Sequence, residues 1–192
     1  MKALEEKILK EGKVLPGNIL KVGSFLNHQI DVDFTMEMGK EIARLFGEEG
    51  VNKILTIETS GIPIAVAAGA AMHVPVVFAK KHKSSNVSGE VLSTSVHSYT
   101  HNTDYTVVVE SDYLSPDDNV LIVDDFLANG KALKGLIDII SKAGASVAGA
   151  CCAIEKGFQK GGDELRADGI RVESLAVIDS MDNCRITFRK QG

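Results

Sequence analysis

One stretch of the chain decides its fold, Val120-Leu121-Ile122-Val123-Asp124-Asp125-Phe126-Leu127-Ala128-Asn129-Gly130-Lys131-Ala132. Its first four residues are apolar and predict a short buried strand, and residues 131–143, closed by Gly144, predict a helix. Between them stand two adjacent carboxylates and a turn of small residues. Adjacent carboxylates can accept from a pair of sugar hydroxyls or from water on a magnesium ion. Backbone N–H groups at the start of a helix favour a phosphate, and Gly130 lets the backbone approach its oxygens.

Hydroxyl recognition followed a few residues later by phosphate recognition describes a site for ribose 5-phosphate. The alternative interpretation is that Asp124 and Asp125 cap a turn and that Gly130 is an ordinary glycine at a helix entry. The spacing alone leaves both interpretations open.

On both sides of this stretch, apolar strands alternate with helices. We expect strands over 51–58, 74–79, 147–154 and 172–178, and helices over 62–72 and near 163–167. Before them, we expect a short helix ending at Gly12, an irregular segment over 14–30, and a helix capped by Asp33 that ends near Gly47. Apolar and polar residues alternate over 92–99 and 105–109, which predicts a β-hairpin or an extended flap.

This alternation predicts an α/β fold with a central, mostly parallel sheet. Ligands bind at the carboxyl ends of the strands in such folds. The loops at 59–61, 124–130 and 155–157 are therefore the first places to look for chemistry.

Composition narrows the class of protein. The chain has 192 residues, enough for one domain with a sizeable core, and its net charge of -5 argues against a non-specific nucleic-acid binder. The charged segment 1–7 lacks the apolar core of a signal peptide, and the apolar run 62–72 is too short to cross a membrane. Cys151, Cys152 and Cys184 are too few for a disulfide scaffold and favour a reduced, cytoplasmic protein. Cys151 and Cys152 are adjacent, so on a strand they point to opposite faces.

Two further segments could bind anions. Thr59, Ser60 and Gly61 form a small-residue turn between a predicted strand and a predicted helix, like the turn at Gly130. Lys80, Lys81 and Lys83 open a polar stretch after another strand, where compact, mobile charges would suit a leaving group that gains negative charge. Small residues are common at strand ends, and a basic loop is more often simply solvated.

The first stretch resembles the phosphoribosyl pyrophosphate signature of type I phosphoribosyltransferases, which has four apolar residues, two acidic residues and a Thr-Gly-x-Thr type loop. Asn129 and Ala132 stand where many members have threonines, so two hydroxyl donors are missing and the Asn129 amide can replace one. The resemblance implies that the 5-phosphate is held by a turn whose residues are Ala128, Asn129, Gly130, Lys131 and Ala132. It also implies that Thr59, Ser60 and Gly61 bind pyrophosphate.

A narrower resemblance covers essentially the whole chain. The segments 20–22, 24–31 and 154–159, together with 123–130, resemble bacterial xanthine phosphoribosyltransferases. By that resemblance Leu20, Asn27 and Lys156 line the purine base. The chemistry agrees, because a lysine can donate to the C6 oxygen of an oxopurine, whereas adenine carries an amino group there.

The resemblance implies a type I phosphoribosyltransferase fold with a flap and a small hood drawn partly from residues 1–35. It implies transfer of the phosphoribosyl group to N9 of xanthine, with Asp124 and Asp125 at the ribose and Mg²⁺ bound as the complex with phosphoribosyl pyrophosphate. No residue is assigned as a direct metal ligand. A homodimer is expected, in which Lys80, Lys81 or Lys83 reaches the neighbouring subunit's pyrophosphate.

Two rivals remain from the sequence. The first is a transferase for hypoxanthine, guanine or adenine. The second is a regulator that senses phosphoribosyl pyrophosphate with this fold, but such regulators carry an added DNA-binding domain. Here the fold-like pattern begins within the first few dozen residues of an acidic chain, which disfavours the regulator.

Overall fold

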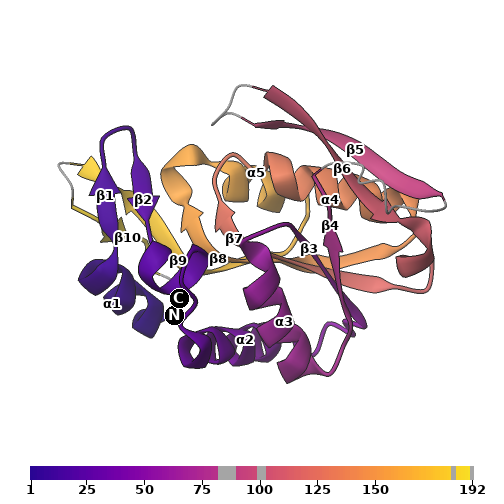
Figure 1. Cartoon of the computed structure of the whole chain (residues 1–192), viewed down its shortest axis with the longest axis horizontal. Coiled ribbons are helices and arrows are strands. Elements are labelled where there is room, and N and C mark those ends of the chain that lie inside the picture. Colours follow the sequence, from indigo (N-terminus) through magenta and orange to yellow (C-terminus); the bar gives the residue numbers. More distant parts are fainter. Residues whose placement is uncertain (82–89, 99–102, 183–184, 191–192) are drawn as a thin grey trace.

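A six-stranded sheet forms the centre of the molecule (Figure 1). The computed structural model describes residues 1–81, 90–98, 103–182 and 185–190. Within them the strand order is β10-β9-β8-β7-β3-β4. The bounds are β3 Lys53–Ile57, β4 Val76–Ala79, β7 Asn119–Leu127, β8 Ser146–Lys156, β9 Val172–Ser180 and β10 Thr187–Phe188. All neighbouring pairs are parallel except β10 with β9. The predicted α/β fold with a mostly parallel sheet is confirmed.

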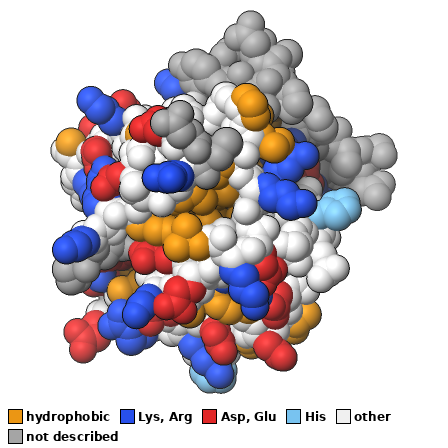
Figure 2. Space-filling view, turned by 90° about the vertical axis from the view of Figure 1, so that its left-hand side faces the viewer, with side chains coloured by type: hydrophobic (Ala, Val, Ile, Leu, Met, Phe, Trp, Pro, Cys, Tyr) orange, Lys and Arg blue, Asp and Glu red, His pale blue; other side chains and the backbone are white. Residues whose placement is uncertain are grey.

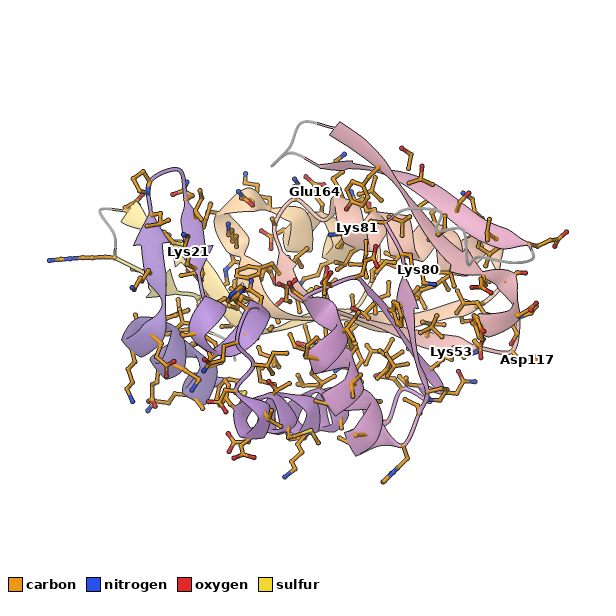
Figure 3. The ribbon with its side chains drawn as sticks, viewed as in Figure 1. Lys21, Lys53, Lys80, Lys81, Asp117 and Glu164 are labelled. Carbon is orange, nitrogen blue, oxygen red and sulfur yellow. The ribbon has the colours of Figure 1, made fainter. Side chains whose placement is uncertain are left out.

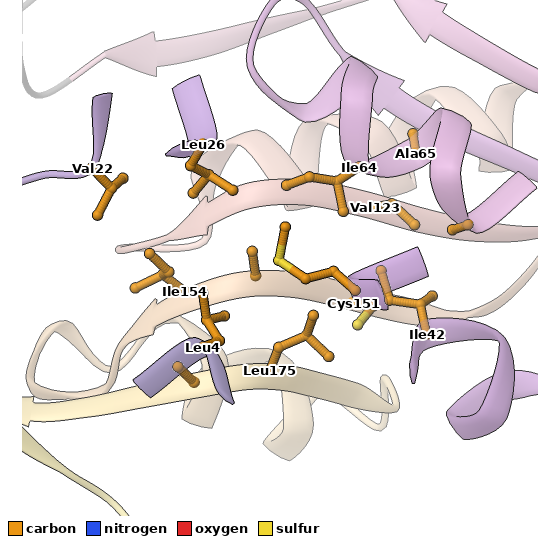
Figure 4. Packing of buried hydrophobic residues seen from close by; sticks show 14 of the residues in the cluster. Leu4, Val22, Leu26, Ile42, Ile64, Ala65, Val123, Cys151, Ile154 and Leu175 are labelled. Carbon is orange, nitrogen blue, oxygen red and sulfur yellow. The ribbon is translucent and has the colours of Figure 1, made fainter. Parts of the chain in front are cut away.

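Helices cover both faces of this sheet. Helices α1 (Lys2–Glu11), α2 (Val32–Phe46) and α3 (Gly61–Met72) lie on one face, and α4 (Lys131–Lys142) and α5 (Gly161–Ala167) lie on the other (Figure 1). Each face buries its own hydrophobic cluster. Cys151 belongs to the first cluster, shown with its neighbours in Figure 4, and Cys152 belongs to the second. The prediction that these adjacent cysteines point to opposite faces is confirmed.

The hood is a small unit formed by N-terminal residues, and it lies beside the carboxyl end of β8, where Lys156 contacts Asn18 (Figure 1). It contains α1, a hairpin of β1 (Lys13–Leu15) and β2 (Ile19–Lys21), and η1 (Gly23–Asn27), a single π-helical segment. The segment expected to be irregular therefore contains two short strands. The expected cap of α2 was also wrong. Asp31 accepts from the N–H of Phe34 at 3.2 Å, and Asp33 lies inside the first turn.

The predicted flap is an antiparallel hairpin of β5 (Val91–Ser98) and β6 (Thr103–Glu110). It packs on α4, where Gly135 leaves room for Val96, because a Cβ at Gly135 would lie 2.6 Å from a Val96 methyl carbon. Lys80 bridges the end of β4 to Val108 of the hairpin. Two 3-10 turns, η2 (Ser111–Tyr113) and η3 (Gly157–Gln159), complete the described elements.

Two strands run further than their apolar cores suggested. β7 continues past Val123 to Leu127, and β8 continues to Lys156, because the two strands pair in parallel as far as Leu127 and Glu155. Asp124, Asp125 and Lys156 therefore lie on strands and not in the loops where the sequence placed them. Among the described residues, the helices are all too short or too polar to cross a membrane.

Candidate functional site

A small polar cavity of about 120 Å³ lies where the carboxyl ends of β3 and β7 meet. Segments far apart in the sequence contribute to it. Its lining residues are Ile57, Glu58, Thr59, Ser60, Lys81, Tyr105, Asp124, Asp125 and Ala132. The structure thus brings together the two adjacent carboxylates, the Thr59–Ser60 turn, one basic-segment lysine and the last residue of the turn at Gly130.

Asp124 is the most strongly perturbed group in this cavity. Its side chain is 5% exposed, and its Oδ1 accepts from the N–H of Asp125 at 2.9 Å. Burial raises the pKa of Asp124 well above its usual value, and the neighbouring Asp125 carboxylate raises it further. The ionised form of such a carboxylate is stabilised when a positive charge or a set of hydroxyl donors binds beside it.

The turn at Thr59 and Ser60 joins β3 to α3. The peptide bond between Glu58 and Thr59 is cis, and no side chain among the described residues caps the start of α3 at Ser60. Gly61 allows the turn to pack against the carboxylate strand. A Cβ at Gly61 would lie 2.3 Å from Thr56 Oγ1 and 2.8 Å from Asp124 Oδ1. Any larger residue at position 61 would therefore disturb both β3 and the carboxylate strand β7.

The turn at Gly130 leads into a helix, as the sequence predicted. Gly130 has φ +75°, in the left-handed region that favours glycine, and it is the N-cap residue directly before α4. Asn129 Oδ1 accepts from the N–H of Lys131 at 3.2 Å, which leaves the Asn129 amide nitrogen as a potential donor. The first residue of α5 supports the turn from behind, since Gly161 donates to the Ala128 carbonyl at 3.1 Å.

The described lysines of the basic segment, Lys80 and Lys81, line two different cavities. Lys81 lines the polar cavity, whereas Lys80 lines a different cavity of about 300 Å³ at the edge of the sheet. Figure 3 shows both beneath the β5–β6 hairpin. Consecutive residues at a strand end point to opposite sides, which explains the separation. Lys83 lies outside the described residues.

Tyr105 is a residue of the cavity that sequence reasoning missed. It comes from β6, and the Lys81 ammonium lies 5.7 Å from the centre of its ring. Burial raises the pKa of Tyr105, and the charge of Asp124 contributes to the same direction. The alternating pattern of the flap strands indicated that one face of β6 is buried. Nothing in the sequence indicated that Tyr105 on this strand reaches the cavity.

The expected base residues lie toward the hood. The Lys156 ammonium donates to the Asn18 carbonyl in the hood hairpin at 3.0 Å and lies 5.8 Å from the centre of the Phe126 ring. Burial lowers the pKa of Lys156. Leu20 is buried in β2, whereas Asn27 is exposed at the end of η1. On this face hydrophobic side chains gather near the centre, with charged side chains around them (Figure 2). The described contacts connect Lys156 to the hood but do not join it to Asn27.

Comparisons with known proteins show the family of the chain. Residues 24–179 match the model of the phosphoribosyl transferase domain family. A xanthine phosphoribosyltransferase of Lachnoclostridium phytofermentans is 54% identical over 95% of this chain and 94% of its own length. One from Bacillus licheniformis is 53% identical over 100% and 98%.

Solved structures support the fold. An adenine phosphoribosyltransferase from Thermoanaerobacter pseudethanolicus superposes with a TM-score of 0.73 at 19% identity, over 91% of this chain and 98% of its own. An APRTase from Giardia lamblia, complexed with 9-deazaadenine, reaches a TM-score of 0.75 at 19% identity, over 91% and 96%. At this level of identity the likeness concerns the fold alone.

Proposed function

Because the chain belongs to the phosphoribosyltransferase family, we propose that it transfers the 5-phosphoribosyl group of phosphoribosyl pyrophosphate to xanthine. The products are xanthosine 5′-monophosphate and pyrophosphate, a reaction of purine salvage. Relatives named xanthine phosphoribosyltransferase, about half identical over nearly the whole chain, support this substrate. The observation that carries the proposal is the polar cavity shared by Asp124, Asp125, Lys81 and the Thr59–Ser60 turn.

The reaction places charge where this cavity offers opposite charge. The bond from C1 of the ribose to the pyrophosphate oxygen breaks as N9 of the purine bonds to C1, and the purine releases one N–H proton to solvent. At the transition state the ribose resembles an oxocarbenium ion, because the first bond is largely broken before the second has formed. Asp124 and Asp125 bind the ribose hydroxyls and face the positive ring. Lys81 and the backbone of the Thr59–Ser60 turn take the growing negative charge of the pyrophosphate. The 5-phosphate lies on the turn formed by residues 128–132.

The carboxylates of the cavity also suit a magnesium ion carried by the substrate. Mg²⁺ prefers oxygen ligands and usually keeps several waters, taking one or two carboxylates together with substrate phosphates. Asp124 and Asp125 supply such oxygens, and within the described residues no larger cluster of metal ligands accompanies them. When bound, the ion would neutralise pyrophosphate charge, while Asp124 and Asp125 hold its water or the ribose hydroxyls.

Base selectivity tests the xanthine assignment. Lys156 is proposed to donate to the C6 oxygen, which xanthine, guanine and hypoxanthine share. Asn27 is proposed to donate toward C2, where xanthine has an oxygen and guanine an amino group. An unmatched buried polar group costs about 1–3 kcal/mol, or roughly one to two orders of magnitude in selectivity. Lys156→Ala should therefore lower kcat/KM for all oxopurines, whereas Asn27→Ala should affect xanthine most.

The measurement is pyrophosphate release with each purine in turn. Lys21→Ala is the matched control, because Lys21 is an exposed lysine of the hood hairpin that Lys156 contacts through Asn18 (Figure 3). It should leave the order of the bases unchanged. An Asn27→Ala protein that keeps the full preference for xanthine over guanine would remove the C2 role of Asn27.

A homodimer is the second part of the proposal. Helix α3 contains no charged residue and exposes 53% of Val66, and Phe78 on the edge strand β4 is 43% exposed. Tyr113, 55% exposed, lines the 300 Å³ cavity beside Phe78, together with Lys80 and Glu110. Exposed apolar surface of this kind is typical of interfaces. A second copy would cover it, and Lys80 with Glu110 offers charges of both signs to a symmetric partner.

Mixing two inactive variants tests whether the basic segment acts across the dimer. A Lys81→Ala subunit and a subunit altered at Gly130 should together recover part of the activity if Lys81 serves the neighbouring cavity. Heterodimers purified with two different tags, compared with each homodimer, provide the measurement. A verified heterodimer without recovery would show that Lys81 serves its own subunit's cavity.

We further propose that the chain works as one domain in the cytoplasm. Both cysteines of the described residues, Cys151 and Cys152, are buried free thiols. Thiols that remain reduced fit that compartment. Burial also raises the pKa of both, so neither is poised as a thiolate.

A further inference from the structure

An ion pair with one fully buried partner, Glu155, and one partly exposed partner, Arg166, lies next to the proposed base lysine. Glu155 is the residue before Lys156 on β8, and it is 1% exposed. Its two oxygens accept from the Arg166 guanidinium at 3.0 and 2.8 Å, and one of them also accepts from the Ser174 hydroxyl at 2.6 Å. A carboxylate this buried needs such partners, and a two-pronged arginine contact fixes orientation as well as charge.

This pair holds the start of α5 in place. Arg166 belongs to α5, and a Cβ at Gly162 would lie 2.1 Å from Glu155 Oε1. The helix therefore sits directly on the carboxylate. Arg166 also donates from Nε to the Val172 carbonyl at 3.1 Å, which anchors it to β9.

The other side of the same helix start touches the phosphate turn. A Cβ at Gly161 would lie 2.4 Å from the Ala128 oxygen, the Asn129 carbon and the Gly130 nitrogen. One turn of α5 is thus packed between the Glu155 carboxylate and the turn proposed to hold the 5-phosphate. Any shift of the pair is passed to that turn by direct contact.

We infer that the Glu155–Arg166 pair sets the separation between the base lysine, Lys156, and the 5-phosphate turn. Glu155 and Arg166 are positioning residues and touch no substrate. The inference rests on the proposed function, since that function assigns the base to one side of the pair and the phosphate to the other. A nucleotide spans both sides, whereas ribose 5-phosphate occupies only one.

The test compares ligands that span the site with ligands that do not. In Glu155→Gln the amide keeps the shape of the side chain but turns one acceptor oxygen into a donor, so the two-pronged contact with Arg166 is lost. Affinity for xanthosine 5′-monophosphate should fall about tenfold or more, and kcat should fall with it. The reason is that Lys156 and the 5-phosphate turn must bind one ligand together, so even a small change in their separation weakens that binding. Affinity for ribose 5-phosphate should stay within about twofold.

The matched control is Glu164→Gln, which lies on the same helix and pairs with Lys134 at 3.1 Å without touching Glu155. It should change neither affinity. Arg166→Lys keeps the positive charge but cannot make the two-pronged contact with Glu155. Its affinity for xanthosine 5′-monophosphate should lie between those of Glu155→Gln and the unmodified protein. If Glu155→Gln does not fold, Ser174→Ala takes its place in the comparison, because this substitution removes one hydrogen bond to the same carboxylate.

Calorimetric titration with both ligands distinguishes the possible results. An equal loss for both ligands, or no loss in a folded Glu155→Gln protein, would overturn the positioning role. Unmodified protein that binds neither ligand would instead overturn the proposed function on which the inference rests.

Discussion

Asp124→Asn is expected to lower kcat/KM by about 100-fold or more while it stabilises the folded protein. The loss follows because the amide cannot supply negative charge to the ribose ring or to water on a magnesium ion. The gain follows from the burial of Asp124. The pKa of Asp124 is raised in the folded protein, mainly by burial, above its usual value of 3.8. The folded state therefore binds the proton more tightly than the unfolded state, and stability falls as the pH rises through this window.

Thermal melting measures the second half of this prediction. At about pH 7 the variant should melt at least about 2 °C above the unmodified protein, and the difference should shrink as the pH falls toward 3.8. The carbonyl oxygen of the introduced amide can still accept from the Asp125 N–H, so the local hydrogen bond survives. Asp125→Asn is the control, because Asp125 is more exposed and should give a smaller gain in stability. A fully active Asp124→Asn protein would assign Asp124 a turn-capping role only.

Gly161→Ala is expected to raise the KM for phosphoribosyl pyrophosphate by about tenfold or more, with a smaller effect on the KM for xanthine. The added methyl group would lie 2.4 Å from three backbone atoms of the 5-phosphate turn, so the turn must move. Steady-state kinetics with each substrate varied separately provide the measurement.

Loss of stability must be separated from loss of phosphate binding. Gly39→Ala is the matched control, because its methyl group would lie 2.4 Å from the Ala67 carbonyl carbon, between α2 and α3. It should lower the melting temperature without raising the KM for phosphoribosyl pyrophosphate. If both variants change this KM equally, the effect reports general destabilisation and the turn loses its assignment.

Much of the fold could be predicted because apolar periodicity reflects burial. The adjacent Cys151 and Cys152 were correctly placed on opposite faces, since neighbouring residues of a strand always alternate. The hood hairpin escaped prediction because its strands have three residues each and surround Pro16 and Gly17. Three residues are too few to show a period. The continuation of β7 through Asp124 was missed because it depends on pairing with β8, which is not local in sequence.

The candidate site follows the same division. Strand ends on one edge of a parallel sheet converge, so the meeting of Asp124 with the Thr59–Ser60 turn could be expected. Which of Lys80 and Lys81 faces the cavity depends on the parity of a strand end, which the sequence leaves open by one residue. Tyr105 and the contact between Gly161 and Ala128 depend on how the flap and α5 fold back onto the sheet. No short motif records that arrangement.

The central claim is the transfer of a phosphoribosyl group to xanthine, and pyrophosphate release measures it most directly. The unmodified protein is incubated with phosphoribosyl pyrophosphate, Mg²⁺ and one of xanthine, guanine, hypoxanthine or adenine. We expect release with every oxopurine that reaches the site, with kcat/KM for xanthine about tenfold or more above that for guanine, and negligible release with adenine. Equal rates with guanine and xanthine would contradict the xanthine assignment, and no release with any of the four purines would contradict the transferase itself.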